Sequence, residues 1–94
     1  MNIIPTSLEG LLIIEPDIFG DTRGYFLETY HQRRYQSAGL DATFVQDNLS
    51  FSKKGTLRGL HFQITHPQAK LVQVITGKIF DVAVDIRPES PTFG

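Results

Sequence analysis

His61 and Lys70 are the two residues whose types and spacing best suit chemistry at a carbon atom. His61 lies in a mostly apolar stretch, residues 57–63, and Lys70 follows in the same half of the chain. Histidine titrates near neutral pH and can take a proton from a carbon next to a carbonyl. A lysine ammonium can stabilise the resulting enolate, because it places positive charge where negative charge develops. Taken singly, a buried structural histidine and a surface lysine remain open alternatives.

Two arginines and two amides could bind a polar substrate. Arg23 follows a turn, and Arg58 lies three residues before His61. Arginine suits phosphate and pyrophosphate because its guanidinium carries forked donors. Gln46 and Asn48 are two positions apart, so an extended strand places them on one face, where they could bind hydroxyls or a base edge. A solvated surface role is the alternative for all four residues.

The glycine spacing around His61 partly fits the metal-binding motif of cupin barrels, which is Gly, five residues, His-x-His, a gap, Glu, six residues and Gly. Gly55 and His61 have the spacing of its first part, and Lys70 and Gly77 that of its last part. However, Gln63 replaces the second histidine and Lys70 the glutamate. Gln is a poor ligand, and an ammonium cannot ligate while charged. The spacing therefore predicts a cupin barrel with no bound metal.

The amino-acid composition excludes several classes of protein and several kinds of site. The 94 residues are 40% hydrophobic and 20% charged, which is typical of one small globular domain or part of one, with a thin core. Nine basic and ten acidic residues leave no excess of positive charge for nucleic acid. The absence of cysteine excludes disulfides, thiolate metal sites and a Cys nucleophile. The longest apolar run, residues 11–14, is too short for a bilayer, and residues 1–5 lack signal-peptide features, so we expect a cytoplasmic protein.

Alternating apolar residues between turns predict an all-β fold of about six strands. We expect strands at 10–15, 25–30, 43–48, 56–63, 70–76 and 78–87, and a loop at 19–24. One short helix is predicted at 31–38, with a capping box formed by Thr29 and Gln32 and with Gly39 after its end. His31 in this helix and His66 beside Pro67 are expected to be solvated.

These strands would form an antiparallel sandwich or barrel that is incomplete within the 94 residues. Exposed sheet edges are avoided in natural proteins, so we expect a longer barrel or pairing with another chain. Arg58 and His61 are an odd number of positions apart, and a regular strand would send them to opposite faces. A bulge or bend at Gly59 would let both reach one site.

Several long motifs, in order, resemble the dTDP-4-dehydrorhamnose 3,5-epimerase family from about Gly10 to Gly94. They are Phe19-Gly20-Asp21-Thr22-Arg23-Gly24-Tyr25-Phe26, Phe44-Val45-Gln46-Asp47-Asn48, Leu57-Arg58-Gly59-Leu60-His61-Phe62-Gln63, Lys70-Leu71-Val72 and Phe80-Asp81-Val82-Ala83-Val84-Asp85-Ile86-Arg87. The resemblance implies a metal-free cupin, or double-stranded β-helix jelly roll, of which residues 1–94 form the N-terminal part of a single domain. It also implies a homodimer that exchanges N-terminal strands and needs no cofactor.

The same resemblance implies a reaction and its residues. The family removes protons at C3 and C5 of a dTDP-linked 4-keto-6-deoxyhexose and returns them on the opposite face. His61 matches its base, and Lys70 matches the residue that supports the enolate. Its substrate-binding positions are matched by Arg23, Glu28, Gln46, Asn48, Arg58 and Phe19. The proton-donor tyrosine and the aspartate that orients the histidine are expected beyond Gly94, and Asp81 is the best orienting carboxylate before it.

Two other functions fit the same residues. A catalytically silent nucleotide-sugar-binding module would keep the arginines and amides but lack the proton donor. A sister isomerase would act only at C3 or would move the ketone. Incorporation of solvent deuterium into the sugar would distinguish an enzyme from a binding module.

Overall fold

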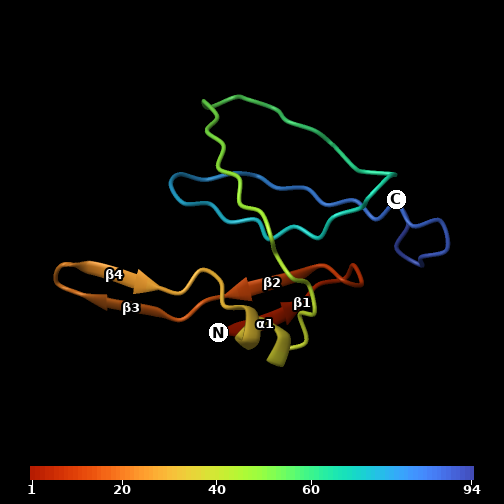
Figure 1. The fold of residues 1–94 in the computed structure, drawn as a ribbon. Coiled ribbons are helices and arrows are strands. Elements are labelled where there is room, and N and C mark those ends of the chain that lie inside the picture. Colours follow the sequence, from red (N-terminus) through yellow and green to blue (C-terminus); the bar gives the residue numbers. More distant parts are fainter. The chain divides into compact units, whose positions relative to one another are not determined.

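The structure, a computed structural model, describes residues 1–94 (Figure 1). The chain divides into two compact units, one made of Met1–Asp41 with Ala83–Gly94 and the other of Ala42–Val82. The regular elements are β1, β2, β3, β4 and α1, all in the first unit. Short antiparallel strands and one short helix, as predicted, therefore make up its regular structure. The structure contains no helix with the length and apolar character needed to cross a membrane.

β1 (Asn2–Pro5) and β2 (Leu12–Glu15) form an antiparallel pair in the register Asn2↔Glu15 to Pro5↔Leu12. The connection is closed by the Thr6 hydroxyl, which donates to the Leu11 carbonyl at 2.9 Å. The predicted strand at 10–15 is confirmed from Leu12 onward. Apolar alternation explains the pairing, because Leu12 and Ile14 are half-buried while the residues between and beyond them are exposed.

β3 (Ile18–Asp21) and β4 (Gly24–Leu27) form a second antiparallel hairpin. The predicted loop at 19–24 is wrong, because the chain turns only at Thr22 and Arg23 and pairs immediately on both sides. The turn is stabilised by the Arg23 N–H, which donates to Asp21 Oδ1 at 2.8 Å. The predicted strand at 25–30 is confirmed only as far as Leu27.

α1 (Gln32–Ser37) confirms the predicted helix but not its cap. The N-cap is His31, whose Nδ1 accepts a hydrogen bond from the Arg34 N–H at 3.3 Å. The capping box predicted from Thr29 and Gln32 is therefore wrong, because the His31 imidazole, and not the Thr29 hydroxyl, caps the helix. Gly39 follows the helix with φ +90, the left-handed conformation expected after a helix end.

Tyr35 of α1 is the buried hydrophobic residue of the structure, with 4% of its surface exposed. Its hydroxyl donates to the Thr29 carbonyl at 2.9 Å, and its ring meets Tyr30 edge to face, with centroids 4.9 Å apart. Burial raises the pKa of the Tyr35 hydroxyl. The thin core expected from the chain length is confirmed.

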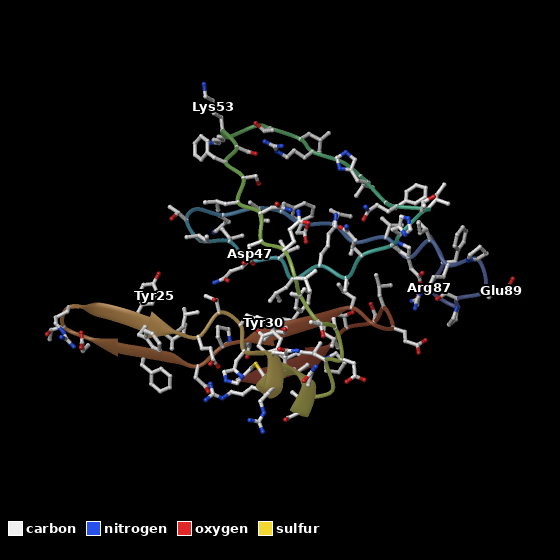
Figure 2. All side chains as sticks on the ribbon, in the orientation of Figure 1. Tyr25, Tyr30, Asp47, Lys53, Arg87 and Glu89 are labelled. Carbon is white, nitrogen blue, oxygen red and sulfur yellow. The ribbon has the colours of Figure 1, made fainter.

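Residues 85–94 form a turn around the buried carboxylate of Asp85, which accepts hydrogen bonds from side chains of Arg87, Ser90 and Thr92. Its backbone carbonyl accepts from the Gly94 N–H at 2.8 Å. The Arg87 guanidinium, followed by the two hydroxyls, holds the pKa of the Asp85 carboxyl well below its ordinary value. Figure 2 labels Arg87 and Glu89 on this turn.

The second unit, Ala42–Val82, contains no hydrogen-bonded strand. The predictions of strands at 43–48, 56–63 and 70–76 are therefore wrong for this structure, as is the strand at 78–87, which spans both units. A strand is stabilised by ladder bonds to a neighbour, and alternation predicts only which faces it would bury. Most apolar residues that produced the pattern are exposed here, such as Leu57, which is 91% exposed, while Phe44 is half-buried.

Candidate functional site

His61 and Lys70 both lie in the second unit and are exposed. His61 is therefore not the buried core histidine that the sequence left open as an alternative. An exposed imidazole and an exposed ammonium are accessible to a substrate, and neither makes an ion pair in this chain. Asp81 is also exposed and belongs to the same unit.

Arg58 is held by the chain that precedes it. Its Nε–H donates to Ser52 Oγ at 2.8 Å, and its Nη2 donates to the Phe51 carbonyl at 3.3 Å. Directly after it, Gly59 has φ +97, which takes the backbone out of the extended conformation. The strand in which this bend was predicted is absent, so the role of Gly59 in bringing Arg58 and His61 to one site stays a prediction. Sequence reasoning did not identify Ser52, whose only signal was its place in a turn before the arginine.

Gln46 and Asn48 contact each other, although the strand predicted to place them on one face is not formed. Gln46 Nε2 donates to Asn48 Oδ1 at 3.2 Å, and both residues are exposed. This bond leaves the Gln46 carbonyl oxygen and the Asn48 amide nitrogen available, so the pair offers a ligand one acceptor and one donor group.

Arg23 occupies the turn between β3 and β4 and pairs with Asp21. Its Nε donates to Asp21 Oδ2 at 3.1 Å, and its Nη2 also bonds to this oxygen. The Arg23 guanidinium holds the pKa of Asp21 below its ordinary value, and the carboxylate raises the pKa of Arg23. Asp21 was not identified from the sequence as a site residue, although the Asp-x-Arg spacing in a turn was available as a signal.

The remaining two predicted site residues flank this hairpin. Glu28 directly follows β4 and forms an ion pair with Arg34 of α1, so its carboxylate already has a partner. Phe19 of β3 is opposite Phe26 of β4 and is 64% exposed. A phenyl ring this exposed is available to stack against a ligand or against another chain.

The predicted residues thus divide between the two units. Phe19, Arg23 and Glu28 belong to the first unit, and the other five, Gln46, Asn48, Arg58, His61 and Lys70, belong to the second. The structure directly joins only Gln46 and Asn48. No group of three or more His, Cys, Asp or Glu residues is arranged to hold a metal ion.

The part of the chain that matches known proteins includes all of the predicted site residues. The family model described as dTDP-4-dehydrorhamnose 3,5-epimerase matches residues 5–94. A protein of that name from Methanothermobacter thermautotrophicus is 58% identical over 93 residues, which are 99% of this chain and 50% of the relative. One from Shigella flexneri is 53% identical over 96 residues, covering 100% of this chain and 53% of the relative.

A third relative carries a different name. The dTDP-4-dehydrorhamnose 3-epimerase of Streptomyces niveus is 44% identical over 96 residues, which cover 100% of this chain and 46% of the relative. This chain spans about half the length of the curated relatives it matches. Short antiparallel strands with one short helix define a broad class, the small and mostly β proteins. Within that class, the chain belongs to the dTDP-4-dehydrorhamnose 3,5-epimerase family.

Proposed function

We propose that this chain is the N-terminal part of an isomerase that converts dTDP-4-dehydro-6-deoxy-D-glucose to dTDP-4-dehydro-L-rhamnose in dTDP-L-rhamnose biosynthesis. The reaction inverts C3 and C5 beside the C4 ketone. The observation that carries the proposal is the family match over residues 5–94, which includes every candidate site residue. The names of the relatives from Methanothermobacter thermautotrophicus and Shigella flexneri support it.

In the proposed mechanism, His61 removes the proton from C3 and later from C5. The electrons of each broken C–H bond move toward the C4 carbonyl and give an enolate. The Lys70 ammonium stabilises the negative oxygen, since it interacts more strongly with the enolate than with the ketone. His61 keeps the abstracted proton, and an acid other than His61 and Lys70 delivers a proton to the opposite face of the enolate, which completes each inversion. Exposure of both side chains supports these roles, because a substrate can reach them.

Substrate binding is assigned to residues whose side chains can form hydrogen bonds with the substrate or offer it a flat apolar surface. Arg58 and Arg23 are proposed to bind the diphosphate, and Gln46 with Asn48 the polar groups of the sugar or base. Glu28 is proposed to accept a hydrogen bond from a sugar hydroxyl, and Phe19 to pack against the nucleotide. The amide pair supports this assignment, because the two side chains are joined by a hydrogen bond and each keeps a polar group for a ligand.

Residues 1–94 are proposed to form part of one cupin domain, a metal-free jelly roll that works in the cytoplasm as a homodimer with exchanged N-terminal strands. The exposed apolar side chains of the β3–β4 hairpin support a partner there, since Phe26 is 70% exposed opposite Phe19, which is 64% exposed. No cofactor is proposed, because proton removal and enolate stabilisation are assigned to the side chains of His61 and Lys70.

The test is solvent exchange. The protein is incubated in D₂O with dTDP-4-dehydro-6-deoxy-D-glucose, and deuterium at C3 and C5 is measured by NMR. We expect His61→Ala to slow exchange by roughly 10²–10⁴-fold, the usual contribution of a general base, with thymidine diphosphate binding preserved. His66→Asn is the matched control. Exchange at the wild-type rate in His61→Ala would refute the mechanism.

A 3-epimerase is the second candidate, favoured by the name of the relative from Streptomyces niveus. It predicts deuterium at C3 and none at C5 in the same experiment. Binding of thymidine diphosphate without exchange at either carbon would instead identify a catalytically silent nucleotide-sugar-binding module.

A further inference from the structure

Arg58 presents one edge of its guanidinium to its own chain and leaves the other free. A guanidinium has five N–H donors. Two of them, on Nε and Nη2, bond to Ser52 Oγ at 2.8 Å and to the Phe51 carbonyl at 3.3 Å. The two hydrogens of Nη1 and the second hydrogen of Nη2 remain for another acceptor. The free donors are therefore at the tip of the side chain.

The loop that supplies these acceptors is itself closed. The Thr56 N–H donates to the Lys53 carbonyl at 3.2 Å, and Gly55 has φ +84 within this turn. Figure 2 labels Lys53 at the turn. Ser52 lies just before the turn and Arg58 just after it, so the Nε–Oγ bond crosses the base of the loop. The bond therefore fixes the direction of the guanidinium relative to the backbone.

Charge distinguishes this arrangement from that of Arg23. The same edge of Arg23 is bound by the Asp21 carboxylate, so the pair has no net charge. The partners of Arg58 are a hydroxyl and a carbonyl, and Arg58 makes no ion pair. Arg58 therefore keeps its full positive charge for an incoming anion. Of the two arginines, Arg58 is the better suited to a phosphate.

We propose that Ser52 is a positioning residue, which holds the Nε edge of Arg58 so that its Nη1 end meets the diphosphate of a nucleoside diphosphate. This inference rests on the proposed function and adds a residue to that site. A free arginine side chain loses rotamer freedom when it binds a ligand. The Ser52 bond fixes the side chain in advance and so lowers that cost.

The test is calorimetric titration of thymidine diphosphate into the protein. Ser52→Ala is expected to weaken binding about 3–10-fold, the usual value of one such hydrogen bond. Ser52→Thr keeps the hydroxyl and should restore affinity. Ser50→Ala, in the same stretch, is the matched control and should bind as the wild type does. With the proposed substrate, KM should rise and kcat should stay constant, because the diphosphate is bound equally in the ground state and the transition state.

Arg58→Ala separates failure of this inference from failure of the proposed function. If Arg58→Ala binds thymidine diphosphate as tightly as wild type, the proposed binding role of Arg58 is wrong. If Arg58→Ala weakens binding and Ser52→Ala does not, only the inference about Ser52 is wrong. In the Arg58→Ala background, Ser52→Ala should have no further effect. If Ser52→Ala weakened thymidine diphosphate binding further in that background, Ser52 would have a direct or merely structural role, and the proposal would be overturned.

Discussion

At the scale of residues, the two candidate arginines are each held by a neighbour from their own turn. Asp21 accepts from both Nε and Nη2 of Arg23, whereas Ser52 accepts from Nε of Arg58 and the Phe51 carbonyl accepts from its Nη2. The sequence allowed the arginines to be identified, because residue type limits what a side chain can bind. It did not identify their neighbours, since that requires the path of the backbone through the turn.

Replacing Lys70 by methionine tests its assigned role at the enolate. Methionine keeps most of the apolar stem and loses the charge. The enolate oxygen exists only along the reaction path, so we expect kcat to fall roughly 10²–10³-fold while affinity for thymidine diphosphate stays unchanged. Steady-state kinetics and calorimetric titration measure the two effects.

Lys54→Met, at an exposed turn position, is the control for loss of one lysine charge and should retain wild-type kcat. A silent Lys70→Met substitution would make Lys70 an ordinary surface lysine. Loss of affinity with kcat preserved would move Lys70 from the enolate to the diphosphate or a hydroxyl.

At the scale of elements, local chemistry was predictable and long-range pairing was not. The helix, its terminal Gly39 and the strand that became β2 were predicted correctly, because their signals lie within a few residues. The cap was assigned to Thr29, since a hydroxyl is the commoner cap, yet the His31 imidazole forms the bond. Alternation at 43–87 predicted strands, but it cannot specify a partner, and none of those residues is paired in a ladder.

The turn at 85–94 should open in acid. The native pKa of Asp85 is below its unfolded value of about 3.9, so its carboxylate stabilises the turn above that pH and loses this effect as pH falls below it. Arg87 faces the carboxylate, and Glu9 acts on Arg87. We expect the protection of the Gly94 amide, measured by NMR as its exchange rate relative to that of an unstructured peptide at the same pH, to fall below about pH 4.

Asp85→Asn should leave the Gly94 amide poorly protected already at neutral pH, and this low protection should no longer change in acid. Glu89→Gln, on the same turn, removes one exposed charge and should behave as the wild type does. If Asp85→Asn protects Gly94 as well as wild type does, the carboxylate is not what closes the turn.

At the scale of the whole molecule, the chain exposes far more apolar surface than a stable monomer does. Tyr25 is 73% exposed on β4, and most residues of the second unit that carry the apolar alternation are exposed as well. Apolar surface of this kind and unpaired strand edges mark surfaces that another chain covers. Composition predicted a thin core, whereas no local pattern could show which surface a partner covers.

We therefore expect an assembly of at least two chains at micromolar concentration. Light scattering coupled to size-exclusion chromatography measures the mass. Phe26→Lys on the exposed hairpin should shift the distribution toward the monomer, because a charge would be buried at the interface. The matched control is Lys54→Glu, which changes charge at an exposed turn and should leave the mass unaltered. A folded wild-type monomer would contradict the expectation.

The contact between Tyr30 and Tyr35 also determines what optical spectroscopy will report. The chain has three tyrosines and no tryptophan. Two of these tyrosines meet edge to face, and the third, Tyr25, is largely exposed. Aromatic circular dichroism in the near ultraviolet requires fixed surroundings. Its tyrosine bands will therefore report the packing of Tyr30 against Tyr35 of α1. They will change little when a ligand binds around His61.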